Sequence, residues 1–184
     1  MKTKKMAVLV LDMNNDHVLN DNPFNSERLR TKIPKISAFL KKARSLEMPI
    51  VYVTDAHRSN DWVFSVKSMK PHAIDGTYGA EIINQLKPES DEYIVKKRRF
   101  SGFYGTDLDL YLGELGISRV VLVGGPTHVS VRYTAVDAYQ LRYKVSVIKD
   151  CTDSPTEELY KSALNDMFFT ERIESESFFA KYIP

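Results

Sequence analysis

The chain has 184 residues, with a formal net charge of +2 at pH 7, and 43% of its residues are hydrophobic. These values are typical of one globular domain, which we expect to span residues 1–184, and the scattered basic residues exclude a strongly basic nucleic-acid-binding surface. No apolar stretch approaches the roughly 20 residues that cross a membrane. The single cysteine, Cys151, excludes an internal disulfide and favours a cytoplasmic location.

Six short runs are typical of β-strands, the last of them weakly. In chain order they are Ala7–Leu11, Ile50–Thr54, Tyr93–Val95, Val120–Val123, Val145–Ile148 and Thr170–Ile173. The first and fourth are apolar at every position, a pattern that indicates strands buried on both faces, as in a parallel sheet.

Helical patterns lie between the strands. They cover Pro34–Leu46, Thr106–Leu115, Val129–Leu141 and a segment that a Ser154-Pro155-Thr156-Glu157 capping box opens and that runs to about Met167. Strands and helices therefore alternate. This alternation predicts an α/β fold with three layers, α/β/α, and a mostly parallel, Rossmann-like sheet of about six strands.

Polar side chains follow the predicted strands. Asp12 follows the first strand, Asp55 and His57 the second, and Lys97 the third, while a loop from Gly124 to Ser130 follows the fourth and opens a helix. Each alone has an ordinary structural explanation as a cap, a turn or a solvated charge. Because ligands bind beyond the carboxyl ends of strands in open α/β sheets, their joint placement indicates one functional edge.

Five segments in this order resemble the isochorismatase-like cysteine hydrolases. The segments are Val10–Asp16, Val53–His57, Pro71–Glu81, Lys97–Phe103 with Gly105–Leu108, and Gly124–Ala138. The resemblance covers about residues 6–150. It implies a hydrolase that acts on C–N bonds of small linear amides.

The third segment resembles the nicotinamidase and pyrazinamidase branch, because Pro71-His72 precedes Gly-Thr-x-Gly-Ala-Glu and Asp-x-His lies upstream. In that branch an aspartate and two histidines bind a divalent metal. We expect zinc, with iron or manganese as alternatives. The matching residues are Asp55, His57 and His72. Two imidazoles and a carboxylate leave open coordination positions for water or a ligand.

The catalytic set that the resemblance implies is Asp12, Lys97 and the residue at position 130. The family has a cysteine there, and this chain has Ser130. A helix N-terminus can ionise a thiol, but a serine hydroxyl starts from a far higher pKa and needs a good general base. Ser130 is therefore either an engineered substitution that disarms the enzyme or the native residue of a slow hydrolase or a binding protein.

The resemblance also implies a cis peptide bond just before the nucleophile. Here that bond is Gly125–Pro126, and a cis bond costs least before proline. We expect it to be cis, with the Ser130 amide and those of Thr127 or Val129 as oxyanion donors, since Pro126 has no N–H.

The walls of the substrate pocket depart from the nicotinamidase pattern. His17 stands where an aromatic residue is usual, Met69 replaces a tryptophan and Ala73 replaces a cysteine. We expect His17, Trp62, Phe103 and Tyr133 to contact the substrate.

Three functions are consistent with these residues. The first is a metal-containing amidohydrolase that converts a small amide such as nicotinamide into its acid and ammonia through an acyl-enzyme. The second is an N-carbamoylsarcosine-amidase-like enzyme, or another small-amide hydrolase, without a required metal. The third is a non-catalytic small-molecule binding protein. The resemblance also implies a homo-oligomer, and neither a nucleic acid nor a membrane is expected as a partner.

Overall fold

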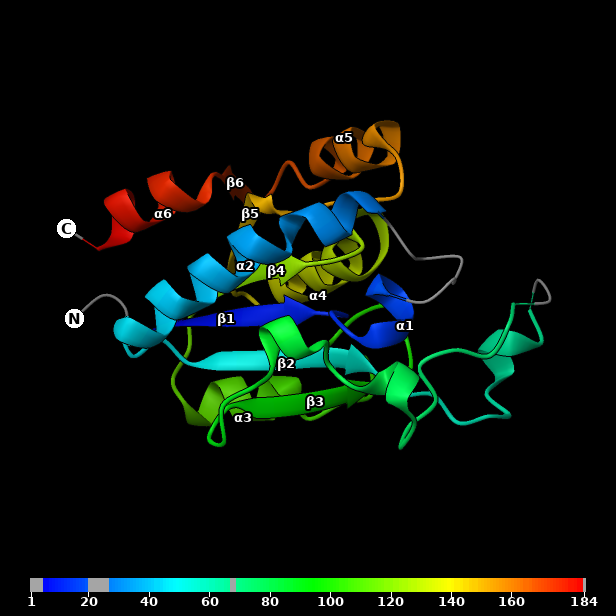
Figure 1. Ribbon diagram of the computed structural model, residues 1–184. Helices are drawn as coiled ribbons and strands as arrows, with labels where there is room; N and C mark the ends of the chain where they lie inside the picture. Colours follow the sequence, from blue (N-terminus) through cyan, green and yellow to red (C-terminus); the bar gives the residue numbers. More distant parts are fainter. Residues whose placement is uncertain (1–4, 20–26, 67–68, 184) are drawn as a thin grey trace.

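The sheet is parallel throughout and has six strands in the described part of the chain. A computed structural model describes residues 5–19, 27–66 and 69–183. The strands lie in the order β3-β2-β1-β4-β5-β6 (Figure 1). They are β1 (Met6–Leu11), β2 (Ile50–Asp55), β3 (Tyr93–Lys97), β4 (Arg119–Gly124), β5 (Lys144–Thr152) and β6 (Glu171–Ile173). The predicted α/β class and parallel sheet are confirmed.

The apolar runs predicted as buried strands occupy the middle of the sheet. Every residue of β1 and β2 is buried, and β1 lies between β2 and β4. Residues such as Leu9 and Val121 have no exposed surface because helices cover both faces. The central strands therefore hold the residues that follow their carboxyl ends in fixed positions.

Helices cover the two faces of the sheet, completing the three predicted layers (Figure 1). They are α1 (Asn15–Val18), α2 (Glu27–Ser45), α3 (Leu108–Glu114), α4 (Arg132–Gln140), α5 (Glu157–Asp166) and α6 (Ser175–Tyr182). On one face, Phe39 of α2 packs against Phe178 of α6, with ring centroids 5.8 Å apart. On the other, Leu112 of α3 and Ala135 of α4 share a second apolar cluster.

Several helix boundaries differ from the sequence predictions. Helix α2 begins at Glu27, so Pro34 lies inside it rather than in its first turn. Proline forfeits one backbone hydrogen bond there, and the buried apolar face of the helix outweighs that cost. Thr156, not Ser154, caps α5 and accepts a hydrogen bond from the amide of Leu159. Helix α6 was not predicted.

The strand order reverses beside β1, whose neighbours are β2 on one side and β4 on the other. Such a switch point opens a crevice at the carboxyl edge of an α/β sheet. Leu11 pairs with Gly124, and Asp55 pairs with Lys97, so the ends of β1 to β4 lie level with one another. The topology thus brings the predicted functional residues to one edge. No helix in the described ranges is long and apolar enough to cross a membrane.

Candidate active site

Asp12 follows β1 directly and is held in an unusual backbone conformation. Its φ angle is +45°, in the left-handed region that few residues other than glycine adopt. The carboxylate is buried, and its Oδ1 accepts a hydrogen bond from the amide of Asp55, at 2.8 Å. Oδ2 is thereby left facing the crevice. Backbone strain of this kind persists only where the surrounding structure fixes it, as active sites often do.

Lys97 ends β3 and joins two carboxylates. Its Nζ lies 2.8 Å from Asp12 Oδ2 and 2.5 Å from Asp55 Oδ1, and the side chain is 1% exposed. Burial alone would lower the pKa of Lys97, but the charges of Asp12 and Asp55 raise it above its ordinary value. Burial would likewise raise the pKa of Asp55, but Lys97 lowers it overall. The ammonium group therefore stays charged and offsets one of the two carboxylate charges.

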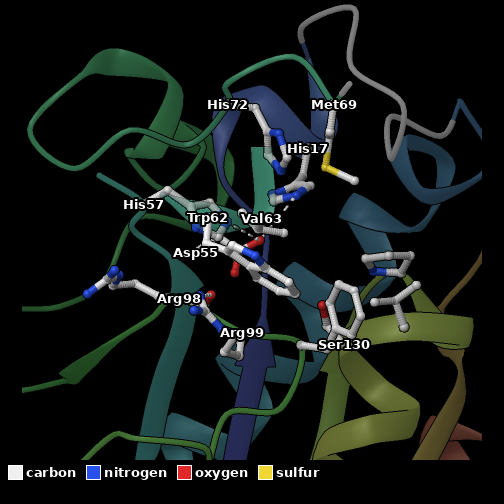
Figure 2. A pocket seen from close by; sticks show the side chains of 13 residues that line it. His17, Asp55, His57, Trp62, Val63, Met69, His72, Arg98, Arg99 and Ser130 are labelled. Atoms are coloured by element: carbon white, nitrogen blue, oxygen red, sulfur yellow. Dashed lines mark hydrogen bonds and ion pairs between the residues drawn. The ribbon is translucent and has the colours of Figure 1, made fainter. Parts of the chain in front are cut away.

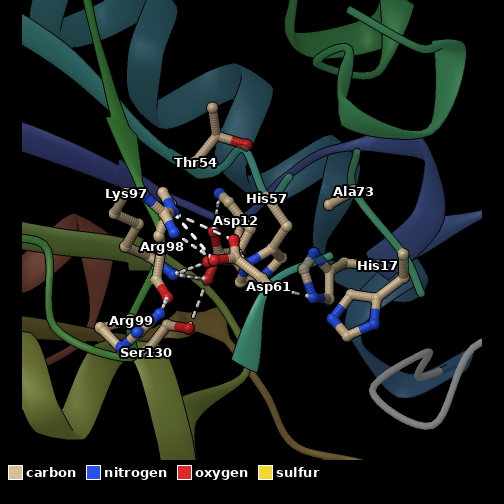
Figure 3. A network of polar contacts seen from close by, with 12 residues as sticks. Asp12, His17, Thr54, His57, Asp61, Ala73, Lys97, Arg98, Arg99 and Ser130 are labelled. Atoms are coloured by element: carbon tan, nitrogen blue, oxygen red, sulfur yellow. Dashed lines mark hydrogen bonds and ion pairs between the residues drawn. The ribbon is translucent and has the colours of Figure 1, made fainter. Parts of the chain in front are cut away.

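Ser130 lies in a π-helical turn, Thr127–Val131, that leads into α4. Its Oγ donates a hydrogen bond to Asp12 Oδ2, the same oxygen that Lys97 contacts (Figure 3). Asp12 thus sits between a hydroxyl and an ammonium group. The structure brings the predicted catalytic trio together in one buried corner, which we call the catalytic corner.

The Gly125–Pro126 peptide bond is cis, as predicted. Two of the three predicted oxyanion donors are used elsewhere. The Thr127 amide donates to the carbonyl of Asp153, at 2.9 Å, and the Val129 amide donates to that of Pro126, at 3.2 Å. The amides of Thr127 and Val129 thus make backbone contacts that shape the turn. The roles of Thr127, Val129 and Ser130 as oxyanion donors stay predictions.

Three imidazoles gather around the second oxygen of Asp55. His17 Nε2 lies 3.5 Å from Asp55 Oδ2, and His57 Nε2 lies 3.6 Å from it (Figure 2). The donor atoms of His17, Asp55 and His72 all lie within 4.8 Å of one another, and all three residues are buried. Burial lowers the pKa of His17, which favours its neutral, metal-binding form. We call His17, His57 and His72 the imidazole cluster.

The donor chemistry of this cluster suits a divalent metal. Imidazole nitrogens with one carboxylate oxygen are ligands that zinc, iron and manganese accept. Asp55, His57 and His72 were predicted as ligands, and the structure places all three here. It also adds His17, which was predicted as a pocket wall.

A cavity of about 100 Å³ opens between the imidazole cluster and Ser130 (Figure 2). It is small beside the pockets that hold drug-sized ligands, so it suits a small molecule. The residues that line it are His17, Asp55, His57, Trp62, Val63, Met69, His72, Arg98, Arg99, Phe100, Pro126, Val129 and Ser130. Most of this lining is apolar or aromatic.

Two predicted wall residues do not line the cavity. Phe103 stacks on Tyr143, with ring centroids 5.7 Å apart, beside the apolar core. Tyr133 is 45% exposed and packs on Phe100. Tyr133 is therefore turned largely to solvent and does not reach the cavity. Phe100 lines the cavity instead.

Sequence reasoning missed Asp61 and the role of Arg98. The buried carboxylate of Asp61 accepts hydrogen bonds from the Arg98 guanidinium, and its Oδ2 lies 3.4 Å from His57 Nδ1. The hydrogen bond from Arg98 holds the pKa of Asp61 well below its usual range. Asp61 therefore fixes the orientation of His57. In the sequence, the only indication was that Asp61 lies four residues after His57. The conformation of the loop between them brings the Asp61 carboxylate to the His57 ring.

The fold and the site define a hydrolase. Residues 6–177 match the Isochorismatase domain family, and the chain belongs to this family. An isochorismatase-like hydrolase from Alkaliphilus metalliredigens is 43% identical, with a TM-score of 0.92 over 97% of this chain and 99% of that one. The pyrazinamidase of Pyrococcus horikoshii, solved in complex with zinc, is 27% identical, with a TM-score of 0.86 over 92% of this chain and 99% of its own.

A plant relative bears on the question of activity. The probable inactive nicotinamidase At3g16190 of Arabidopsis thaliana is 30% identical over 177 residues, covering 89% of this chain and 88% of its own length. The chain is therefore similar both to a protein named as a pyrazinamidase and to one named as a probable inactive nicotinamidase.

Proposed function

We propose that this protein is an amidohydrolase that converts a small amide, such as nicotinamide, into its carboxylic acid and ammonia. One observation carries the proposal: Asp12 Oδ2 faces both the Ser130 hydroxyl and the Lys97 ammonium group beside a small cavity. Nucleophile, base and a charge that steadies the base thus meet where a substrate fits.

The proposed reaction has two steps, acylation of Ser130 and hydrolysis of the resulting ester. Asp12 accepts the hydroxyl proton of Ser130 as its oxygen attacks the amide carbonyl, and the same proton passes to the leaving nitrogen, which departs as ammonia. The product is an ester on Ser130. Water then attacks this ester, giving its proton to Asp12, and the acid leaves with Ser130 restored.

Lys97 has a positioning role in this scheme. It holds Asp12 Oδ2 at 2.8 Å and Asp55 Oδ1 at 2.5 Å, so the base cannot rotate away from Ser130. Its positive charge also favours the negative charge that develops on the carbonyl oxygen during attack. A divalent metal held by Asp55 and the imidazole cluster would add a positive charge beside the cavity.

Ser130 makes the reaction slow, because an alcohol is much harder to deprotonate than a thiol. The Ser130→Cys variant restores the nucleophile that the family has at this position. We expect it to release ammonia from nicotinamide or from an N-carbamoyl amide at least about 100-fold faster than the parent, because efficient removal of the nucleophile's proton contributes on the order of 10²–10⁴.

The assay measures ammonia release by the parent and by the Ser130→Cys, Ser130→Ala and Asp12→Asn variants. Ser130→Ala keeps the cavity and removes the nucleophile, so it should be inactive, and adding Asp12→Asn to Ser130→Cys should cancel the gain. A folded Ser130→Cys variant that hydrolyses none of the small amides tested would overturn the proposal. If it still bound an amide, a binding protein on the same scaffold would be the better description.

A further inference from the structure

Where the family resemblance expects an aromatic side chain, this chain places a third imidazole beside Asp55. His17 is 2% exposed, and its ring meets that of His72 edge-on, with centroids 5.3 Å apart. We propose that His17 is a metal ligand, so that His17, Asp55, His57 and His72 together form a four-ligand centre. The proposal rests on the metal site of the proposed function and adds a ligand to it.

The distances between donor atoms fit one small ion. A zinc ion about 2.1 Å from each ligand of a tetrahedron separates neighbouring ligand atoms by about 3.4 Å. The separations of 3.5 Å from His17 Nε2 and 3.6 Å from His57 Nε2 to Asp55 Oδ2 lie close to that value. The donor atoms of His17, Asp55 and His72 all lie within 4.8 Å of one another, and His57 adjoins this group through its 3.6 Å approach to Asp55 Oδ2.

The other nitrogen of each ring faces an oxygen atom. Nδ1 lies 2.9 Å from Asn14 Oδ1 in His17, 3.4 Å from Asp61 Oδ2 in His57 and 3.0 Å from the carbonyl of Lys70 in His72. Each of these oxygens can accept a hydrogen from Nδ1, an arrangement that assigns Nε2 to the metal. Metal-binding histidines have this arrangement almost without exception.

Asn14 is set up for this role by its neighbours. Its Nδ2 donates to Thr54 Oγ1 at 3.1 Å, which fixes the orientation of the amide and turns Oδ1 toward His17. Oδ1 also accepts the backbone amide of His17, at 2.9 Å, and so caps α1. The segment that carries His17 is therefore fixed against β2, the strand that carries Asp55.

Four protein ligands leave no open position on a tetrahedral ion. Sites of this kind hold their metal firmly and do not bind a further ligand, whereas sites with three protein ligands keep a position for one. The ring nitrogen of nicotinamide would then have no coordination position, and the substrate would be held by the cavity walls. The substrate class is therefore small amides in general rather than those with a metal-binding ring nitrogen.

The first experiment measures metal affinity and needs no turnover. Metal-stripped parent, His17→Phe and His128→Gln proteins are titrated with Zn²⁺, and their Co²⁺ forms are compared by visible absorption. His128 is the one histidine of the chain outside the cluster, so His128→Gln is the matched control. We expect His17→Phe to weaken binding at least about 100-fold, since even loss of a partner behind a ligand costs about 10–100-fold.

The Co²⁺ spectrum reports how the ion is coordinated. Tetrahedral Co²⁺ absorbs visible light much more strongly than the six-coordinate ion. The parent and His128→Gln should show the same strong spectrum, and that of His17→Phe should be shifted because water replaces one imidazole. Equal affinity and an unchanged spectrum in a folded His17→Phe protein would overturn the proposal.

The second experiment asks whether a ring nitrogen reaches the metal. Nicotinamide and benzamide have the same shape, but only nicotinamide has that nitrogen. Neither should change the Co²⁺ spectrum of the parent, and nicotinamide alone should change that of His17→Phe. A change in the parent with nicotinamide but not with benzamide would contradict a closed centre. A parent that binds no metal refutes the role of His17, while the ammonia assay with Ser130→Cys still decides the amidase proposal.

Discussion

The two oxygens of Asp55 face opposite kinds of chemistry. Oδ1 contacts the Lys97 ammonium group in the catalytic corner, whereas Oδ2 faces the imidazole rings of His17 and His57. The catalytic corner is balanced by fixed charges within the chain. The imidazole cluster places three rings near one carboxylate oxygen, where the proposed metal would supply the positive charge. One buried residue thus joins an ionic network within the chain to the proposed metal site.

Removing the charge of the catalytic corner should have the largest effect on stability. Lys97→Met leaves Asp12 and Asp55 buried beside each other without their counter-ion, and breaking such a pair costs about 3–5 kcal/mol. Lys96→Met, on the same strand, is the control, because Lys96 makes only an exposed pair with Asp75, worth about 1 kcal/mol or less. Denaturant unfolding of metal-free protein measures both. Equal losses would mean that the corner is not held by its charges.

The imidazole cluster should tolerate a comparable change without metal. His17→Phe keeps a ring of similar size, and Asn14 Oδ1 keeps the backbone amide of residue 17 as its donor. We therefore expect a change in the free energy of unfolding within about 1 kcal/mol, as for exchange of a satisfied polar group for an apolar one. The same unfolding measurement, with chelator present, checks it. A loss as large as that of Lys97→Met would remove the distinction between the two regions.

The smallest effect concerns His128, which precedes Ser130 in the π-helical turn. Burial, aided by the charge of Arg132, lowers the pKa of His128, so the unfolded chain takes up a proton near pH 6.5 before the folded protein does. Stability should therefore fall as the pH is lowered from 7 to 5. Solvent screens this half-buried ring, so the slope should lie well below the roughly 1.4 kcal/mol per pH unit of one full proton.

His128→Gln removes that proton and should flatten the dependence of stability on pH by this small amount. Unfolding curves of the parent and the variant between pH 5 and 7, both with chelator, give the difference. An unchanged slope would show that the environment of His128 does not resist protonation.

The strands and the catalytic corner could be predicted because they depend on local pattern and on topology. Runs that are apolar at every position mark central parallel strands, and parallel strands bring Asp12, Lys97 and Ser130 to one edge. The proline signal misplaced the start of α2, since burial of Leu29 extends the helix on the N-terminal side of Pro34. Helix propensity alone does not include the free energy gained by burying a side chain in the folded protein.

The details of the site depend on contacts that no local pattern specifies. The Thr127 amide is engaged by Asp153, which is 26 residues away along the chain, and Asp61 acquires its role only when Arg98 folds against it. His17 was placed in the pocket wall because an aromatic residue is usual there. Its approach to Asp55 follows from the hydrogen bond between Asn14 and Thr54, a contact across 40 residues.

The contact between Ser130 and Asp12 spans 118 positions of the chain. Bringing such distant residues together carries a loop-closure cost that only the assembled sheet offsets. A nascent chain synthesised as far as β3 already contains Asp12 and Lys97 but lacks the Ser130 hydroxyl. The catalytic corner therefore forms late in synthesis, together with the folded sheet, and a chain truncated before Ser130 has no activity.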